Sequence, residues 1–180
     1  VRAYRVVDEE LAELSYEQLL VPLDGSQRAE CVLPAARAVA DYHNCRLLVA
    51  HVVPRPEVPR HAPLTEEETD LVERLTELNR RHGQEYLEDV EGRLSPGVET
   101  RLLVSDNAAA ALHELVSEED ADMVLLSAHG YSGEAQWPYG SVALNFIAYG
   151  TTPLLIVQDI SRAEIGTTPA EKAASEAKGH

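Results

Sequence analysis

Two short glycine-containing segments hold the residue types best suited to binding an anion. Ser127-Ala-His-Gly130 follows an apolar run, and Gly140-Ser141-Val142 opens a second apolar segment that continues to Tyr149. The run Met123–Leu126 is typical of a buried strand, and residues 142–149 are typical of a helix. A glycine turn at a strand end, followed by Gly-Ser at a helix start, presents backbone N–H groups and the positive end of a helix. The spacing therefore predicts a phosphate-binding site.

If the phosphate belongs to a nucleotide, two further residues lie where its ribose and base would contact the sheet. Asp24 follows a predicted strand at residues 18–23, and Val52 lies late in a predicted strand at residues 46–53. Ligands of open α/β sheets bind beyond the carboxyl ends of the strands. If the first and fourth strands are neighbours, Asp24 can accept hydrogen bonds from ribose hydroxyls, and Val52 can offer an apolar wall to adenine. The phosphates would be held by backbone N–H groups at Gly130, Gly140, Ser141 and Val142.

Each candidate also has a purely structural explanation. Asp24 precedes Gly25 in a common turn pair, Val52 can belong to the core, the glycines can be loop glycines, and Ser141 can cap a helix. His129 suggests catalysis, but no serine or cysteine in a nucleophile context accompanies it. The chain also lacks the GxxxxGK[ST] motif of P-loop enzymes. Binding is therefore favoured over catalysis.

Composition narrows the class of partner. The 180-residue chain has a net charge of −16, which repels nucleic-acid phosphates and anionic membranes. No stretch approaches the roughly 20 apolar residues of a membrane span, and residues 1–13 do not resemble a signal peptide. Cys31 and Cys45 lack CxxC spacing and histidines at metal-ligand spacing, which favours structural thiols and no metal site. We expect a cytoplasmic protein without nucleic-acid partners.

Strand-like and helix-like segments alternate along the chain, which predicts βαβ units and a parallel sheet. The predicted strands lie at residues 18–23, 46–53, 98–104, 123–127 and 154–157. Residues 16–159 form one predicted domain, residues 1–15 an N-terminal extension, and residues 160–180 a tail whose composition predicts disorder. The alternative for that tail is a partner-binding helix.

Local signals set the predicted helix ends. Ser26 can cap a helix that runs to about Tyr42, and Pro34 inside it predicts a kink or a late start. Thr65 and Glu68 have capping-box spacing at the start of a long helix. Either Ser105 or Asp106 is predicted to cap the helix that begins at Ala108. The long helix is predicted to have one packed face, built from Leu71, Leu75, Leu78, His82, Tyr86 and Val90.

Taken in order, these segments resemble the universal stress protein (UspA) family. Leu20-Val-Pro-Leu-Asp-Gly-Ser26 is similar to the family's first strand and turn, and His51-Val52-Val53 to its second strand. Residues 121–130 and 140–142 are similar to its signature, Gly-x2-Gly-x9-Gly-Ser/Thr. Pro153-Leu-Leu-Ile-Val157 is similar to its last strand. The resemblance covers about residues 16–158.

The resemblance implies both a fold and a function. It implies a three-layer α/β fold of the adenine nucleotide alpha hydrolase-like type, with an open, twisted, five-stranded parallel sheet in the order 3-2-1-4-5 and helices on both faces. It also implies binding of ATP or AMP, with or without Mg²⁺, by a regulatory stress-response protein that pairs into a homodimer through residues 154–158. The implied nucleotide-binding residues are Asp24, Val52, Ser127, His129, Gly130, Gly140, Ser141 and Val142.

One position departs from the family signature. Its first glycine is Ser127 here, which adds a side chain where ribose or the first phosphate should pass. Overpacking of this kind costs about 1–3 kcal/mol, or roughly a 5- to 150-fold loss of affinity. The departure keeps open a nucleotide-independent dimeric module of the same fold. A slow ATPase is the third alternative, although no acid–base pair supports it.

Overall fold

The computed structural model describes residues 15–56, 63–94, 97–130 and 139–158. Its strands have the bounds that the sequence predicts: β1 (Gln18–Leu23), β2 (Arg46–Val53), β3 (Val98–Val104), β4 (Met123–Ser127) and β5 (Leu154–Val157). A 3₁₀ turn, η1 (Ala29–Val32), precedes the helices α1 (Leu33–His43), α2 (Glu66–Leu94), α3 (Ala108–Glu118) and α4 (Ser141–Tyr149).

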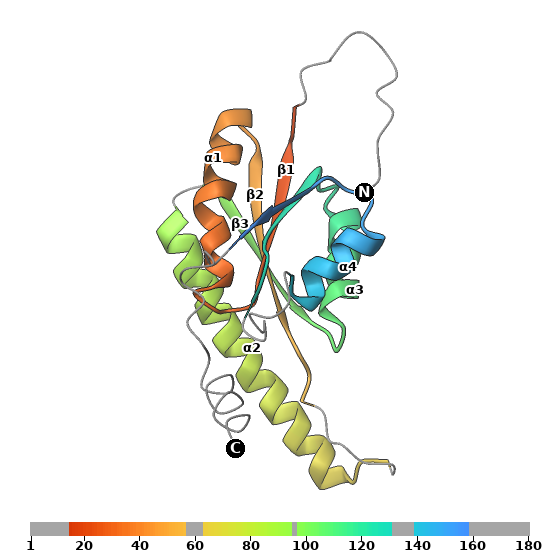
Figure 1. The fold of residues 1–180 in the computed structure, drawn as a ribbon. Helices are drawn as coiled ribbons and strands as arrows, with labels where there is room; N and C mark the ends of the chain where they lie inside the picture. The colour runs from red at the N-terminus through yellow and green to blue at the C-terminus, as the bar shows by residue number, and fades with distance from the viewer. Residues whose placement is uncertain (1–14, 57–62, 95–96, 131–138, 159–180) are drawn as a thin grey trace, which may run out of the picture.

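The five strands form one parallel sheet in the order β3-β2-β1-β4-β5, as the resemblance implies (Figure 1). The order reverses between β1 and β4, which pair at Leu19↔Met123 and Leu20↔Val124. Helices that follow β1 and β4 therefore leave toward opposite faces. Such a switch point opens a crevice at the carboxyl ends of the two strands.

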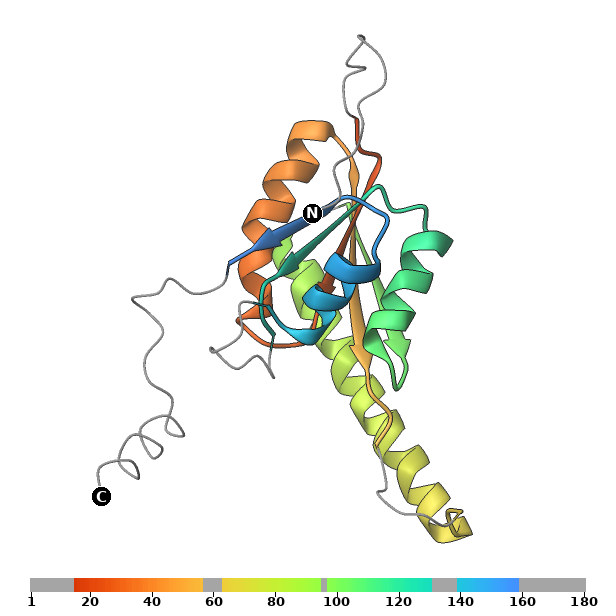
Figure 2. The same ribbon diagram turned by 45° about the vertical axis from the view of Figure 1, so that its right-hand side comes forward.

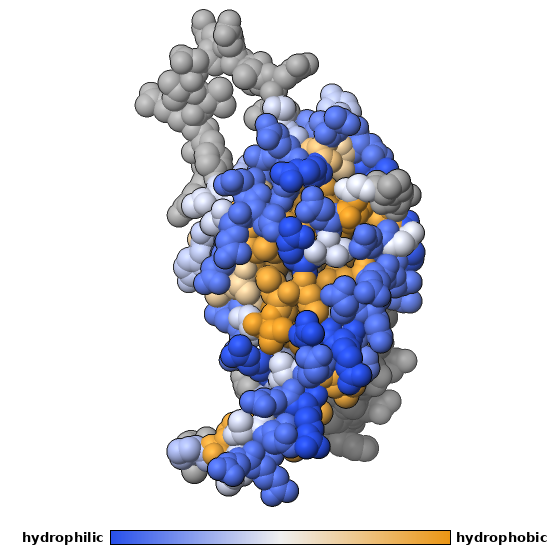
Figure 3. All heavy atoms as spheres, turned by 180° about the vertical axis from the view of Figure 1, so that it is seen from behind, coloured by the Kyte–Doolittle hydropathy of each residue, from blue (hydrophilic) through white to orange (hydrophobic). Residues whose placement is uncertain are grey.

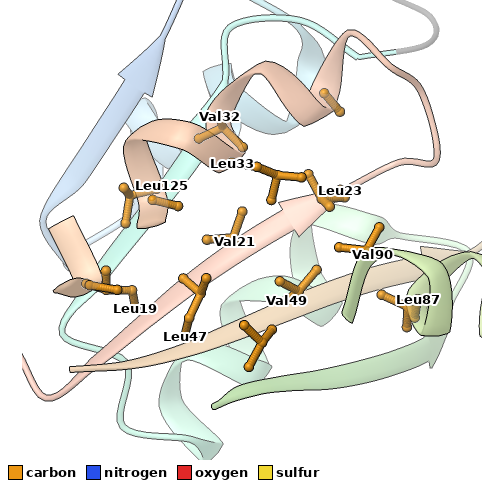
Figure 4. Close-up of a cluster of buried hydrophobic side chains, with 14 residues drawn as sticks. Leu19, Val21, Leu23, Val32, Leu33, Leu47, Val49, Leu87, Val90 and Leu125 are labelled. Carbon is orange, nitrogen blue, oxygen red and sulfur yellow. The ribbon is translucent and has the colours of Figure 1, made fainter. Parts of the chain in front are cut away.

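Helices cover both faces of the sheet, with α1 and α2 on one side and α3 and α4 on the other (Figures 1 and 2). Side chains alternate along each strand, so β1 sends Leu19, Val21 and Leu23 into the α1–α2 layer (Figure 4). Leu20 lies in the other layer, with Leu112 of α3 and Phe146 of α4. The buried strands are apolar on both faces, as a parallel sheet between helix layers requires.

The helix starts confirm two predictions and correct two others. Pro34 lies in the first turn of α1, so that helix starts late, after η1. Ser26 does not cap α1, whose N-cap is Val32; its hydroxyl instead accepts a hydrogen bond from the N–H of Ala29 at the start of η1. Thr65 and Glu68 form the predicted reciprocal cap of α2. The cap of α3 is Asn107, whose side chain accepts from the N–H of Ala110, rather than Ser105 or Asp106.

The long helix α2 packs on the sheet only over its C-terminal part. At Gly83 an added Cβ would lie 2.8 Å from a methyl group of Leu102 and 2.9 Å from one of Val53, so helix and sheet approach closely here. Leu87 and Val90 continue this packed face. The N-terminal part of α2 projects beyond the carboxyl ends of the strands (Figures 1 and 2).

That projection makes the predicted packed face of α2 wrong in its first half. Leu71, Leu75 and Leu78 are exposed, by 56%, 39% and 38%. The packed face instead runs through Gly83, Leu87 and Val90. At about 100° per residue, it is turned by roughly a third of the helix circumference from the leucines. Apolar spacing shows that residues share a face, but it does not show what covers that face.

Candidate functional site

A cavity opens at the switch point, between the turns that follow β1 and β4. Its apolar wall is formed by Ala50 and Val52 of β2, Leu112 of α3 and Leu126 of β4. Its polar rim is formed by the two turns and the start of α4. The walls include all eight residues singled out from the sequence: Asp24, Val52, Ser127, His129, Gly130, Gly140, Ser141 and Val142.

The turn after β1 fixes the Asp24 carboxylate. Its Oδ1 accepts hydrogen bonds from the N–H of Ser26 at 3.0 Å and from the Ser26 hydroxyl at 2.6 Å. Gly25 between them has a φ of +85°, a conformation that favours glycine. The other carboxylate oxygen, Oδ2, occupies the space that a Cβ on Gly130 would need. Gly130 is therefore required for the two turns to come this close.

The turn after β4 is closed by the side chain of Ser127. Its hydroxyl donates to the carbonyl of His129 and accepts from the N–H of the same residue at 3.2 Å. Ser127 and His129 are both buried. The serine hydroxyl is thus satisfied by the turn itself, and the His129 N–H is already engaged with it. The His129 N–H is therefore not available to donate to an anion in the cavity.

Gly140 lies against the turn that follows β4. The N–H of Gly140 donates to the carbonyl of Ala128 at 2.7 Å, and the N–H of Ala128 donates to Val157 at the end of β5. Gly140 is the N-cap of α4, whereas Ser141, for which the N-cap alternative was open, is the first helical residue. The Gly140 N–H joins the two segments instead of pointing to a ligand.

The start of α4 supplies the donors that remain. The N–H groups of Ser141, Val142 and Ala143 have no carbonyl one helical turn earlier to accept from them. They lie at the positive end of the helix, beside the cavity. Three backbone donors, an adjacent partial positive charge and an apolar wall behind them suit a small anion attached to an apolar ring.

A wider groove continues from the cavity toward α2. It shares Asp24, Val52 and Ser141 with the cavity and adds His82 and Tyr86 of α2. Burial raises the pKa of Tyr86, and the negative charge of Glu30 raises it further. Tyr86 is therefore neutral at physiological pH.

The sequence profile of the universal stress protein family matches residues 15–158, a span that includes the whole sheet and all four helices. The chain belongs to the universal stress protein family. A curated protein of Staphylococcus saprophyticus that carries the family's name is 24% identical over 149 residues, which cover 81% of this chain and 85% of that protein.

Solved universal stress proteins share the fold. UspA of Lactobacillus plantarum superposes with a TM-score of 0.67 at 16% identity, over 79% of this chain and 98% of that one. A family protein of Arabidopsis thaliana, solved with AMP bound, gives a TM-score of 0.54 at 13% identity. The match covers 86% of this chain and 98% of that one. A universal stress protein solved in complex with cAMP gives a TM-score of 0.52 at 22% identity. The match covers 81% of this chain and 99% of that one.

Sequence reasoning about this universal stress protein missed part of the cavity wall. Ala50, Ala108 and Leu112 line the cavity, and none of them was singled out. Ala50 could have been found, because it precedes Val52 by two residues on β2 and therefore lies on the same face. The groove residues on α2 carry no comparable signal. The sequence also places Trp137 in a loop between Gly130 and Gly140, but residues 131–138 of that loop lie outside the described residues.

Two other site types lack support in the described part of the chain. No group of three or more histidine, cysteine, aspartate or glutamate side chains there could hold a metal ion. Cys31 and Cys45 are partly buried thiols that form no disulfide bond among the described residues. None of the described helices combines the length and the apolarity needed to cross a bilayer.

Proposed function

We propose that this universal stress protein binds an adenine mononucleotide, ATP or AMP, in the β1–β4 crevice and acts as a regulatory stress-response protein in the cytoplasm. One observation carries the proposal. The turn after β1, the turn after β4 and the N-terminus of α4 meet around one cavity with an apolar wall and an anion-binding rim. Family members that bind AMP and cAMP support the choice of base.

Each part of the nucleotide has a counterpart in the cavity. The apolar wall at Ala50, Val52 and Leu126 accommodates adenine. Asp24 accepts hydrogen bonds from ribose hydroxyls, a role that the fixed orientation of its carboxylate favours. The N–H groups of Ser141 and Val142 bind the phosphates, while Gly130 lets the Asp24 carboxylate pack against the turn after β4.

Mg²⁺ would enter with the nucleotide. Because the described residues form no cluster of metal ligands, phosphate oxygens and water would provide most of its coordination. The proposal assigns no catalytic residue. His129 is buried in the turn, and the Ser127 hydroxyl is bonded to the backbone of His129.

Calorimetric titration with ATP, AMP and GTP, each with and without Mg²⁺, tests the proposal. We expect a dissociation constant for ATP of about tens to hundreds of micromolar, because Ser127 reduces a typical micromolar affinity by roughly 5- to 150-fold. No detectable heat and no thermal shift with any of these nucleotides at millimolar concentration would reject it.

A charge variant locates the phosphates. Ser141→Asp adds an acidic side chain at the exposed start of α4, which stabilises the helix and repels phosphate. We expect a roughly 10-fold loss of ATP affinity with adenosine affinity unchanged. Ala110→Asp is the matched control, because it adds the same charge to the first turn of α3, at a residue outside the cavity lining. Equal ATP affinity in the two variants would place the phosphates elsewhere.

A nucleotide-independent dimeric module is the second candidate. Ser127 favours it, because its hydroxyl engages the His129 N–H and its side chain stands at the position of a signature glycine. In that case β5, at the edge of the sheet, would pair with β5 of a second copy. The nucleotide titration above separates the two candidates, since only the first predicts binding.

A further inference from the structure

The projecting half of α2 carries an apolar stripe that no described residue covers. Leu71, Leu75 and Leu78 lie on one side of the helix and are at least 38% exposed. Leu64, just before the helix, is 42% exposed, and His82 continues the line toward the groove. We call Leu64, Leu71, Leu75, Leu78 and His82 the leucine stripe. In Figure 3 apolar patches interrupt the hydrophilic surface of this projecting part.

The stripe has the spacing of a two-helix seam. Leu64, Leu71 and Leu78 recur every seven residues, and Leu75 and His82 fall four residues after Leu71 and Leu78. A seven-residue apolar repeat keeps one line facing a partner helix, because it matches a period of 3.5. A helix packed only on its own domain needs no such repeat, and the packed face of α2 lies elsewhere, at Gly83, Leu87 and Val90.

The charges on either side of the stripe favour one partner. Glu66, Glu67, Glu68 and Asp70 make the start of the projecting half acidic, whereas Arg74, Arg80 and Arg81 follow later. A second α2 running antiparallel would place acidic residues opposite basic ones at both ends. A parallel partner would place the acidic ends together.

We infer that the leucine stripe pairs antiparallel with the leucine stripe of a second copy of this chain. In the register that packs Leu71 against the partner's Leu75, Leu78 lies opposite the partner's Glu68. Glu67 then flanks the partner's Arg81 on both sides of the two-fold axis. The alternative register, with Leu75 against the partner's Leu78, would bring Arg74 beside the partner's Arg81 and is disfavoured by like charge.

One like-charge contact at the axis is already compensated. The favoured register brings Arg74 near the partner's Arg74, and each forms an ion pair with its own Asp70 at 2.7 Å. The same register places Leu64 against the partner's His82, at the rim of the groove beside the nucleotide cavity. Pairing therefore covers that rim, while β5 lies at the far edge of the sheet from β3 and is not used.

Sedimentation velocity from about 1 to 100 μM tests the pairing, on the full chain and in a Leu155→Lys background that removes pairing through β5. We expect Leu75→Glu to raise the dissociation constant of the α2 pair by at least about 100-fold, since the symmetric interface contains the substitution twice. Far-UV circular dichroism checks that the variant retains its helices. An unchanged dissociation constant in a folded variant overturns the inference.

A charge swap tests the orientation. Glu67→Arg and Arg81→Glu should each weaken the pair about 5-fold or more, and the double variant should restore it, because the two charges exchange places across the axis. Glu73→Arg makes the same charge change on the side of α2 away from the stripe and should have no effect. Failure of the double variant to recover, or equal weakening by the Glu73 control, overturns the antiparallel register.

Discussion

At the scale of single residues, Ser127 shapes the turn that borders the proposed nucleotide site. Its hydroxyl closes the turn after β4 by bonding both the carbonyl and the N–H of His129. The turn is thereby stabilised without a glycine, but one N–H is withdrawn from the cavity and a side chain is added to its wall. Stability and affinity thus make opposite demands at this position.

Replacing Ser127 by glycine should separate these two effects. Ser127→Gly frees the His129 N–H and enlarges the cavity, so ATP affinity should rise about 5-fold or more. The free energy of unfolding should fall by about 1–2 kcal/mol, because two hydrogen bonds are lost and the unfolded chain gains freedom. Calorimetric titration and thermal denaturation measure the two quantities. Ser117→Gly, on α3, is a control that should lower stability alone; weaker ATP binding by Ser127→Gly would contradict the account.

The residues of the site were more predictable than their individual roles. Residue types and spacing predicted that Asp24, Ser127, Gly130 and Ser141 share one site, and all four line the cavity. This was possible because strand ends and helix starts can be recognised in a sequence. The sequence did not show that the Gly140 N–H is used by Ala128 or that Asn107 caps α3. Such choices depend on which neighbouring donor or acceptor lies at hydrogen-bond distance in the folded chain.

At the scale of elements, α2 is divided at Gly83 into a part that packs and a part that projects. The missing side chain lets the helix approach β2 and β3 closely. Strand bounds were predictable because buried parallel strands are short apolar runs between polar segments. The packed face of α2 was not predictable, because the leucine stripe and a core face both show helical spacing.

A methyl group at Gly83 should weaken the packing of α2. The added Cβ would lie within 3.0 Å of Leu102, Val53 and His51, and such overpacking costs about 1–3 kcal/mol. Alanine also gains about 1 kcal/mol of helix propensity, so the net loss for Gly83→Ala should be about 0–2 kcal/mol in chemical denaturation. Gly92→Ala is the control, since nothing lies within 4 Å of its added Cβ. If both variants stabilise the protein, the side chains around Gly83 can accommodate a methyl group and the close contact does not limit stability.

The ion pair between Glu30 and Arg93 fastens the C-terminal end of α2 to η1, with two N–H groups donating at 2.8 and 3.0 Å. The hydrogen bond from Arg93 lowers the pKa of Glu30 below 4.5. Because the folded-state pKa is depressed, this contribution to stability is present above about pH 4.5 and is lost as the pH falls through the folded-state pKa.

Arg93→Gln should therefore reduce the free energy of unfolding by about 0.5–1 kcal/mol at pH 7, a small value because the Arg93 side chain is 47% exposed. The difference from the parent protein should shrink as the pH falls below 4.5. Urea denaturation at pH 7 and near pH 3 measures it. A difference that stays constant or grows in acid would rule out the ion pair as its cause.

At the scale of the whole molecule, two apolar regions lie away from the core. One is the leucine stripe of α2; the other consists of β5 at the sheet edge and the outer face of α4, where Leu155, Leu144 and Ile147 are exposed. A net charge of −16 opposes association, so any self-assembly must use specific surfaces such as these. The strand order came from the family resemblance, since apolar runs do not show which strands are neighbours.

Pairing through β5 remains a prediction, and a charge at that edge tests it. Leu155→Lys should abolish the association through β5 and so halve the number of copies in the assembly. The reason is that lysine at an exposed edge strand disfavours strand addition. Combined with Leu75→Glu, it should leave a monomer in sedimentation equilibrium. Leu155→Val keeps an apolar strand former and is the matched control. An unchanged assembly state for Leu155→Lys would remove β5 as an interface.

The central claim is that the β1–β4 crevice holds an adenine nucleotide with its phosphates at the start of α4. A crystal structure grown with millimolar ATP and Mg²⁺ tests it most directly. The account predicts adenine against Ala50 and Val52, ribose at Asp24, and phosphate oxygens within hydrogen-bond distance of the Ser141 and Val142 N–H groups. A well-ordered crevice that stays empty, or ATP bound at another surface, would contradict it.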